Sequence, residues 1–210
     1  MKIDYTLYLV TDRELMSSAT IEESVEQAVI GGCTVVQLRE KDISSDEFYK
    51  LGLRVKAITD KYNVPLIIND RVDIAMAIDA DGVHVGQDDL PCSVVRGIIG
   101  KDKIVGVSAS NLAQAQRAVA DGADYIGVGA MFATGTKTDA VVTTIDELGN
   151  IRKNINVPIV VIGGINKERL PLFKNTGIDG IAVVSAIVSQ PNVSMAAHDL
   201  KQLFKNVVQS

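Results

Sequence analysis

The 210-residue sequence has few aromatic residues and no long uncharged apolar run. Aromatic residues make up 4% of the chain and tryptophan is absent, so the core has to be built from valine, isoleucine, leucine and alanine. No apolar stretch approaches the ~20 residues that a membrane-spanning helix needs. Asp4 interrupts the start of the sequence before a signal-peptide apolar region could form. We therefore expect a soluble, cytoplasmic protein that is not inserted in a membrane.

Cysteine and an excess of positive charge are lacking as well. The two cysteines, Cys33 and Cys92, are too few for a disulfide framework and do not form the Cys-x-x-Cys spacing of a metal site. We expect them to be reduced, buried thiols. The formal net charge is -5, whereas a general nucleic-acid binder needs a basic face. The composition therefore argues against a nucleic acid as partner.

Eight short, nearly continuous apolar runs recur along the chain. Such runs are typical of strands buried on both faces of a parallel sheet. Segments with helical spacing separate them, and two of these segments begin with capping-box patterns, Thr20-x-x-Glu23 and Ser44-x-x-Glu47. The runs cover residues 5–10, 35–38, 66–68, 83–85, 104–107, 125–128, 159–162 and 181–184.

Two sequence patterns that recur along the chain indicate a repeated unit. An Asp, a spacer and alternating branched residues recur at 81–85, 124–128 and 179–183, and Asn-Val-Pro precedes an apolar run at 63–65 and again at 156–158. The second pattern precedes the third and the seventh predicted strands, which are four units apart, as expected for the two halves of an eightfold repeat. Eight strands alternating with helices predict a single-domain (β/α)8 TIM barrel spanning residues 1–210, of class α/β. A doubly wound open sheet is the structural alternative.

Two acidic residues follow adjacent predicted strands, at the end where such a barrel carries its active site. Asp70 and Asp89 would face the same opening. Unpaired carboxylates repel each other and raise each other's pKa, and a divalent cation removes that problem. Mg²⁺ takes one or two protein carboxylates and fills its remaining positions with water and phosphate oxygens. Asp70 and Asp89 are the predicted metal ligands, with a surface, helix-capping role as the alternative for Asp89.

The loops after the seventh and eighth runs have the composition of a phosphate site. Gly163-Gly164 precedes Asn166, which predicts the N-cap of the next helix. Glycines there let backbone N–H groups approach a phosphate, and a helix N-terminus adds favourable partial charge. Ser185 would complete the phosphate site that barrels often form at these two loops. A tight turn without a ligand is the alternative, but the position of Gly163-Gly164 after the seventh predicted strand favours phosphate binding.

Four cations fall at the same end of the predicted barrel: Arg39, Lys41, Arg71 and Lys137. Arg71 is equally compatible with a solvated surface. The others, with the metal and the Gly-Gly loop, would hold two anionic groups. That arrangement suits an enzyme that joins two phosphorylated molecules or expels pyrophosphate.

The histidines do not indicate acid–base catalysis. His84 alternates inside a strand and is interpreted as a packed or hydrogen-bonded barrel residue, and His198 lies on the last amphipathic helix as a surface residue. No Ser-His-Asp or Cys-His arrangement is present to argue for a nucleophile.

Six segments, in this order, resemble thiamine-phosphate synthases (thiamine-phosphate pyrophosphorylases). They read LYLVTD (7–12), QLREK (37–41), NDR (69–71), GVHVGQDDLP (82–91), GVS (106–108) and IGGI (162–165). The family is a (β/α)8 barrel. The resemblance implies that the chain condenses 4-amino-2-methyl-5-(diphosphooxymethyl)pyrimidine with 4-methyl-5-(2-phosphooxyethyl)thiazole, giving thiamine phosphate and pyrophosphate.

The resemblance also implies roles for individual residues. Asp70 and Asp89 would hold Mg²⁺ as the cofactor. The pyrimidine pyrophosphate would be bound by Gln37, Leu38, Arg39, Glu40, Lys41, Asn69, Ser108 and Lys137. The thiazole phosphate would be bound by Thr134, Gly135, Thr136, Gly164, Val184 and Ser185, and Gly163 is expected to join them from its place in the Gly-Gly loop. Arg39, Lys41, Ser108 and Lys137 are the expected catalytic residues. The partners are small phosphorylated molecules, and a homodimer is an open alternative to a monomer.

One segment departs from the family pattern. Where the family commonly has Thr-Thr-Thr-Lys or Thr-Pro-Thr-Lys, this chain has Thr134-Gly135-Thr136-Lys137. Glycine loses more conformational entropy on ordering than other residues do. We therefore expect the departure to affect the affinity for the thiazole phosphate and not the identity of the reaction.

Two other functions are alternatives. A thiazole tautomerase-like barrel would share the fold but would not need Lys41, Asp70, Asp89 and Lys137 together, because a tautomerase needs no metal–pyrophosphate clamp. A non-catalytic ligand-sensing barrel that regulates a partner would need a partner surface, and no basic patch or exposed apolar stripe in the sequence indicates one.

The expected mechanism is a dissociative substitution, which makes Lys137 the first residue to test. Removing a donor that stabilises developing charge typically costs ~3 kcal/mol. Lys137→Ala should therefore lower turnover roughly 100-fold while the fold survives. Initial rates of thiamine phosphate formation, with circular dichroism as the folding control, measure this. Near-normal turnover would contradict the role of Lys137.

Overall fold

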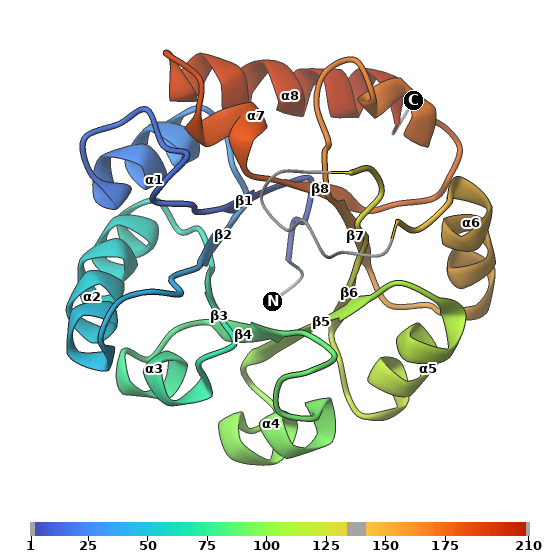
Figure 1. Cartoon of the computed structure of the whole chain (residues 1–210), viewed down its shortest axis with the longest axis horizontal. Coiled ribbons are helices and arrows are strands. Elements are labelled where there is room, and N and C mark those ends of the chain that lie inside the picture. The colour runs from blue at the N-terminus through green and yellow to red at the C-terminus, as the bar shows by residue number, and fades with distance from the viewer. Residues whose placement is uncertain (1–2, 134–141, 209–210) are drawn as a thin grey trace.

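Eight parallel strands form a closed barrel, in chain order, with helices around the outside (Figure 1). The structure is a computed structural model that describes residues 3–133 and 142–208. The strands are β1 (Leu7–Val10), β2 (Val35–Leu38), β3 (Leu66–Asn69), β4 (Gly82–Val85), β5 (Ile104–Ala109), β6 (Tyr125–Val128), β7 (Ile159–Ile162) and β8 (Gly180–Val183). Because β1 pairs with β8, the predicted (β/α)8 barrel is confirmed and the open doubly wound sheet is wrong.

The connections between the strands are mostly helical. They contain α1 (Ile21–Ile30), α2 (Ser45–Lys61), α3 (Val72–Ala77), α4 (Cys92–Ile99), α5 (Leu112–Ala120), α6 (Ile145–Asn154), the 3-10 helix η1 (Leu170–Phe173) and α7 (Ser185–Val188), and α8 (Val193–Val207) ends the chain. Within the described part of the chain, no helix is both long and apolar enough to cross a membrane.

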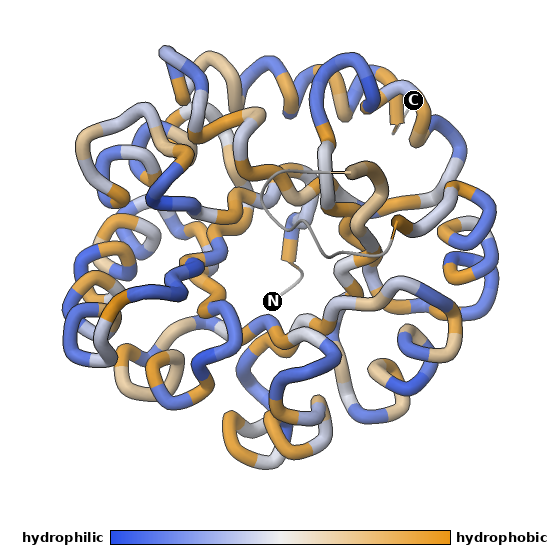
Figure 2. The backbone as a smooth tube through the Cα atoms, viewed as in Figure 1, coloured by the Kyte–Doolittle hydropathy of each residue, from blue (hydrophilic) through white to orange (hydrophobic). Residues whose placement is uncertain are grey.

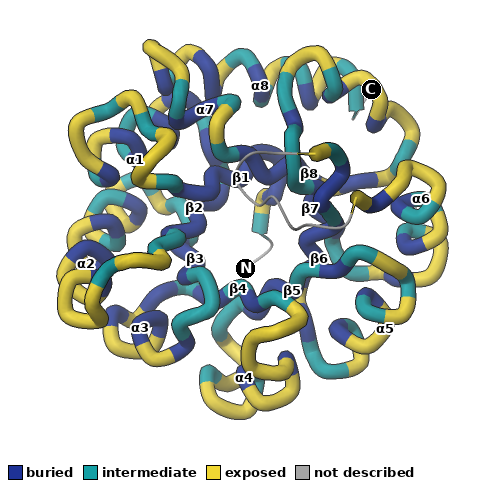
Figure 3. The backbone as a smooth tube through the Cα atoms, viewed as in Figure 1, coloured by how far each residue is buried: buried dark blue, intermediate teal, exposed yellow. Residues whose placement is uncertain are grey.

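The apolar residues form two layers of core. One layer lies between the barrel and the helices, and Figure 3 shows the strands buried while the outer sides of the helices are exposed. Figure 2 shows the matching hydropathy, with apolar strands and helices that alternate between hydrophilic and hydrophobic residues. The second layer fills the barrel interior and includes Tyr5, Tyr8 and Tyr125. Three of the few aromatic side chains in this sequence thus lie in the barrel interior.

Glycine makes room for these rings. A Cβ atom at Gly106 on β5 would lie 2.1 Å from Cζ of Tyr125 on the neighbouring strand. No side chain fits at that distance, so the absence of one at residue 106 is what allows the Tyr125 ring to fill the interior.

The predicted helix starts are confirmed with two corrections. Ser44 and Glu47 form the full capping box of α2. The Thr20 side chain accepts a hydrogen bond from Glu23 N–H, but the Glu23 carboxylate accepts from Ala19 N–H (3.1 Å) and not from Thr20, so only half of that box forms. Asn166 does cap the next turn, accepting from Arg169 N–H (2.9 Å), yet the turn continues into the short 3-10 helix η1 instead of an α-helix.

The recurring Asp of the first sequence pattern has a structural reason. The residue before each even-numbered strand has a side-chain oxygen that accepts a hydrogen bond from a backbone N–H near the start of the preceding odd-numbered strand. The four pairs are Thr34 with Leu7 (3.1 Å), Asp81 with Leu66 (2.8 Å), Asp124 with Val105 (2.8 Å) and Asp179 with Ile159 (2.8 Å). Its own N–H donates back to the carbonyl of that residue. The barrel is therefore tied at its amino-terminal end by four equivalent two-bond clasps.

Each aspartate of these clasps is also paired with a cation from the outer helices. Lys56 on α2 lies 3.7 Å from Asp81, Arg96 on α4 bonds Asp124, and Arg152 on α6 lies 3.2 Å from Asp179. These cations offset the charge that the carboxylates bring to the strand starts, where the carboxylates accept charge-assisted hydrogen bonds from the backbone. The amino-terminal end of this barrel serves stability, as is usual for the fold.

The clasp predicts a stability effect without a functional one. Asp124→Ala removes the acceptor of the buried Val105 N–H and should lower the free energy of unfolding by about 1 kcal/mol. The effect is at the low end because the Asp124 side chain is 46% exposed, so water replaces part of the lost bond. Asp102→Ala is the control, since it removes the same charge from the same end of the barrel. Urea unfolding measures both, and equal stability of the two variants would contradict the role of the clasp.

Candidate functional site

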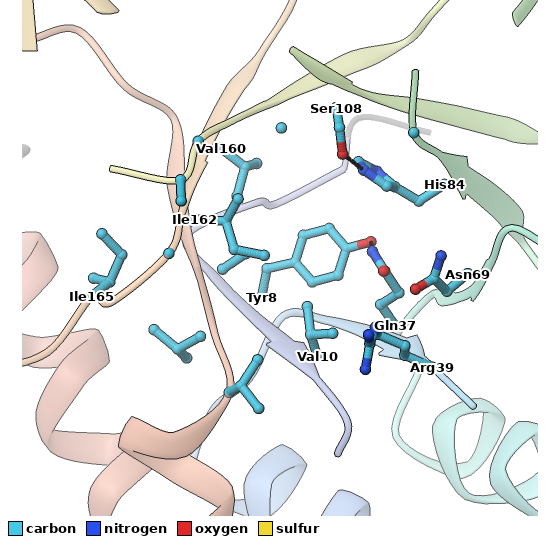
Figure 4. A pocket seen from close by; sticks show the side chains of 18 of the residues that line it. Tyr8, Val10, Gln37, Arg39, Asn69, His84, Ser108, Val160, Ile162 and Ile165 are labelled. Atoms are coloured by element: carbon cyan, nitrogen blue, oxygen red, sulfur yellow. Dashed lines mark hydrogen bonds between the residues drawn. The ribbon is translucent and has the colours of Figure 1, made fainter. Parts of the chain in front are cut away.

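A cavity of about 270 Å³ lies at the carboxyl ends of the strands (Figure 4). Side chains from β1 to β8 line it, because closing the sheet brings all eight strand ends to one opening. The predicted site residues that line the cavity are Gln37, Arg39, Lys41, Asn69, Asp70, Asp89, Ser108, Gly163, Gly164, Val184 and Ser185.

One side of the cavity carries opposed charges. Lys41 Nζ lies 2.5 Å from Asp70 Oδ2, and Asn69 donates a hydrogen bond to the other Asp70 oxygen. Asp89 Oδ2 accepts from Gly86 N–H at 2.7 Å. Burial raises the pKa of Asp70, the neighbouring Asp89 carboxylate raises it further, and Lys41 opposes both by lowering it. Asp70 follows β3 directly and has a φ of 60°, a left-handed conformation that aspartate tolerates better than most residues.

These carboxylates have the chemistry of a partial site for a hard cation. Within residues 3–133 and 142–208, no cluster of three or more His, Cys, Asp or Glu side chains could hold a metal ion by itself. Two neighbouring carboxylates nonetheless match the donor set of Mg²⁺, which takes its other ligands from water and substrate oxygens. Asp70 and Asp89 therefore fit such an ion.

The opposite side of the cavity is a glycine loop. Gly163 has a φ of 99° and Gly164 a φ of 64°, and a Cβ atom at either position would approach another atom to 2.7 Å. Arg169 holds the loop from outside the cavity: its Nη1 donates to the Gly164 carbonyl (2.8 Å) and its guanidinium lies 4.6 Å from the centre of the Phe132 ring. Because the helices that follow β7 and β8 are only four residues each, anion binding here depends on backbone N–H groups and little on a helix dipole.

A chain of hydrogen bonds crosses the floor of the cavity. Gln37 Nε2 donates to Tyr8 Oη (2.8 Å), Tyr8 Oη lies 2.8 Å from Tyr125 Oη, and Tyr125 Oη lies 2.8 Å from His84 Nδ1. His84 Nε2 lies 2.9 Å from Ser108 Oγ. Burial lowers the pKa of His84 to about 4, so the imidazole is neutral at neutral pH. The interpretation of His84 as a hydrogen-bonded barrel residue is confirmed.

Two predicted substrate contacts point away from the cavity. Leu38 is fully buried in the layer between barrel and helices, and Glu40 pairs with Arg13 (3.0 Å). Side chains alternate along a strand and its extension, so Gln37, Arg39 and Lys41 face the cavity while the two residues between them face outward. Arg71 pairs with Asp73 and does not line the cavity, in keeping with a surface role.

The predicted residues Thr134, Gly135, Thr136 and Lys137 lie outside the described residues. Sequence reasoning missed Tyr8 and Tyr125, which line the cavity through their strands β1 and β6. A signal for both was available: each is a polar-tipped aromatic inside an otherwise apolar run, in a chain with few aromatics.

Comparison with known proteins gives one answer. The family model described as thiamine monophosphate synthase matches residues 7–187. The chain is 62% identical to a thiamine-phosphate synthase of Clostridium botulinum over 97% of this chain and 95% of that one, and 62% identical to that of Ruminiclostridium cellulolyticum over 98% of each. Among solved structures, thiamine phosphate pyrophosphorylase from Pyrococcus furiosus matches with a TM-score of 0.90 and 38% identity over 97% of each chain.

The proximity of Asp70 and Asp89 should lower the free energy of unfolding of the ligand-free protein. The pKa of Asp70 is raised in the folded state, so this group favours folding below its unfolded pKa, and that contribution is lost as the pH rises through the folded pKa. Asp89→Asn removes the neighbouring charge while keeping an acceptor for Gly86 N–H. Without divalent cations it should raise the melting temperature at neutral pH by about 2 °C.

The gain from Asp89→Asn should shrink as the pH falls from neutral to acidic values and Asp70 becomes protonated. Asp88→Asn is the matched control, because it removes one charge from the next residue, which does not line the cavity. Differential scanning calorimetry across this pH range measures the effect. A destabilised Asp89→Asn protein at neutral pH would contradict the repulsion.

Proposed function

This chain belongs to the thiamine monophosphate synthase family, and we propose that it makes thiamine phosphate by a dissociative substitution at the cavity described above. The enzyme joins the aminopyrimidine diphosphate to the thiazole phosphate and releases pyrophosphate. The observation that carries the proposed mechanism is the arrangement of two anion-binding regions on opposite sides of one cavity.

The first region would hold the pyrophosphate. Arg39 and Lys41 enter it from the segment after β2, with Asn69 from β3, and Asp12 lies 3.9 Å from the Arg39 guanidinium. The side chain of Thr11 accepts from Arg39 N–H (2.9 Å), which fixes the backbone of the cation-bearing segment. Positioned cations stabilise charge as it develops on a leaving group, at no reorganisation cost during the reaction.

The two carboxylates beside Lys41 would hold the Mg²⁺. Asp70 and Asp89 fit the ion for the reasons given above, and a bound Mg²⁺ would neutralise charge on the diphosphate. Lys41 serves a second purpose in this arrangement, since its ammonium orients the Asp70 carboxylate and opposes the rise in the pKa of Asp70 that burial and Asp89 cause.

The second region would hold the thiazole phosphate. Backbone N–H groups at Gly163 and Gly164, with Ser185 at the start of α7, offer donors to a phosphate, and Val184 borders the same region. We propose that Thr134, Gly135 and Thr136 add to this region and that Lys137 acts on the pyrophosphate, as the family resemblance implies.

No protein nucleophile is required by this reaction. The bond between the pyrimidine methylene and the diphosphate oxygen breaks, the electron pair leaves with pyrophosphate, and the thiazole nitrogen attacks the resulting carbocation. Gln37 and Ser108 would orient the pyrimidine at the cavity floor, where His84 is neutral and is not needed as a base. The apolar wall formed by Val160, Ile162 and Ile165 limits the access of water to the cation.

The two alternative functions are less favoured. Relatives that share 62% of the sequence bear the name thiamine-phosphate synthase, and the chain keeps Lys41, Asp70 and Asp89 together, which a tautomerase-like barrel or a ligand sensor would not need. A cytoplasmic location and a homodimeric state stay predictions, and small phosphorylated molecules are the proposed partners.

One assay tests the proposed chemistry. The protein is mixed with both phosphorylated substrates, and thiamine phosphate and pyrophosphate are measured with Mg²⁺ and with EDTA. We expect both products in equal amounts with Mg²⁺, and a loss of at least about 100-fold with EDTA or in Asp70→Asn. Absence of product with Mg²⁺ would overturn the reaction, and full activity in EDTA would overturn the metal. Asp88→Asn, adjacent to Asp89, should keep normal activity.

A further inference from the structure

The hydrogen-bond chain at the cavity floor joins five strands and ends at a substrate-facing hydroxyl. Gln37 comes from β2, Tyr8 from β1, Tyr125 from β6, His84 from β4 and Ser108 from β5. Figure 4 shows the Tyr8 hydroxyl directed at the Gln37 amide, with His84 and Ser108 joined by a hydrogen bond on one side of the cavity. Tyr8 and Tyr125 are each only 1% exposed, so bulk water does not supply partners to their hydroxyls.

Each link constrains the next because each tyrosine hydroxyl carries a single hydrogen. The Gln37 amide donates to Tyr8 Oη, which leaves the Tyr8 hydrogen for Tyr125 Oη. Tyr125 then gives its own hydrogen to His84 Nδ1, which must be the bare nitrogen of the ring. The His84 hydrogen is consequently on Nε2 and is donated to Ser108 Oγ. The Ser108 hydrogen is left to point into the cavity.

The opposite direction leaves a buried donor unpaired. If His84 Nδ1–H donated to Tyr125, and Tyr125 donated to Tyr8, then Tyr8 would accept from both sides and its own hydrogen would have no partner. A buried donor without an acceptor is costly, so with the Gln37 amide nitrogen facing Tyr8 one direction satisfies every group and the other does not. The local packing also holds the ring planes: a Cβ atom at Gly106 would lie 2.1 Å from Tyr125 Cζ, and one at Gly127 would lie 3.0 Å from His84 Cε1.

We propose that these hydrogen bonds form a directional relay in which Tyr8 and Tyr125 are positioning residues that fix His84 as the Nε2–H tautomer and thereby free the Ser108 hydrogen for donation to the substrate. The proposal deepens the proposed function, on which it rests for the reaction but not for the tautomer. Its consequence is specificity: Ser108 Oγ can donate to a substrate lone pair, on oxygen or a ring nitrogen. In the opposite direction the Ser108 hydrogen would be committed to His84 Nε2, and Ser108 could only accept from the substrate.

The tautomer can be measured directly because the chain contains only 2 histidines. His198 is exposed on α8, so His198→Gln leaves His84 as the single imidazole. Long-range ¹H–¹⁵N spectra of the full-length, ligand-free protein at neutral pH distinguish a protonated from a bare ring nitrogen. We expect Nε2 protonated and Nδ1 bare. A protonated Nδ1, or an equal mixture of the two tautomers, would overturn the relay.

The same spectra test the part played by the tyrosines. Tyr125→Phe removes the donor to Nδ1 and should give a mixture of tautomers, because neither ring nitrogen is then fixed. Tyr5→Phe is the matched control: the Tyr5 ring lies 4.9 Å from the Tyr125 ring, but its hydroxyl is not part of the relay. Tyr5→Phe should leave the His84 spectrum unchanged. An unchanged spectrum in Tyr125→Phe would contradict the proposal.

A double-mutant cycle connects the relay to Ser108. Tyr125→Phe should lower kcat/KM about 10-fold, and Ser108→Ala about 100-fold. The double variant should be no slower than Ser108→Ala alone, because Tyr125 acts through the hydroxyl that is then missing. A purely structural effect of Tyr125 would instead multiply the two losses, which would overturn the proposal.

The proposed reaction and the proposed relay can be refuted independently of each other. An inactive wild-type protein with the Nε2–H tautomer would refute the proposed reaction and keep the relay, whereas an active protein with the Nδ1–H tautomer would do the reverse. If Tyr125→Phe does not fold, the spectrum of the protein carrying only His198→Gln still decides the direction.

Discussion

The pairing of β8 with β1 is the interaction on which the rest of the structure depends. It turns a sheet of eight strands into a ring and so brings eight strand ends to one opening. Tyr8 on β1 and Tyr125 on β6 are 117 residues apart in sequence and on strands that do not pair, yet their hydroxyls are in hydrogen-bond contact inside the barrel. An open sheet would leave these two side chains apart, whereas the contact of Tyr8 with Gln37 joins the paired strands β1 and β2 and does not need closure.

The two ends of the ring divide stability from chemistry. At the amino-terminal end, carboxylates are matched: each accepts from a strand N–H and faces a cation of an outer helix, as Asp124 does with Arg96. At the carboxyl end, Asp70 and Asp89 are left close together with Lys41 beside Asp70, and burial together with the Asp89 carboxylate raises the pKa of Asp70. Unmatched charge at a strand end is unfavourable for the folded protein and useful for binding a cation and a diphosphate.

The barrel interior joins these two ends through packing. Tyrosine rings fill the axis only because Gly106 carries no side chain, and their hydroxyls reach the cavity floor because the rings are held at that depth. A substitution made for stability at residue 106 would therefore displace Tyr125 and alter His84 and Ser108 with it. Dense packing transmits such a shift, whereas a loosely packed interior would absorb it.

Much of this protein was predictable from local patterns in the sequence. The apolar runs located all eight strands to within about two residues, since a strand buried on both faces must be apolar throughout. The polar residues after those runs located most of the site, because carboxyl ends of parallel strands must point the same way. Leu38 and Glu40 were predicted as substrate contacts because the family resemblance covers the whole segment 37–41. The alternation of side chains along a strand turns both of them away from the cavity.

Other features were decided only by the tertiary structure. The half-formed box at Thr20 and the 3-10 turn after Asn166 depend on how neighbouring segments pack, which no local pattern reports. The direction of the relay from Gln37 to Ser108 depends on the register of five strands around a closed ring. Sequence alone determined which groups are polar and near a strand end, because propensity and periodicity are local. Closure of the barrel decided which of those groups are in contact. A hydrogen bond between strands that are distant in sequence forms only when the strand register and the barrel diameter bring the two atoms within reach.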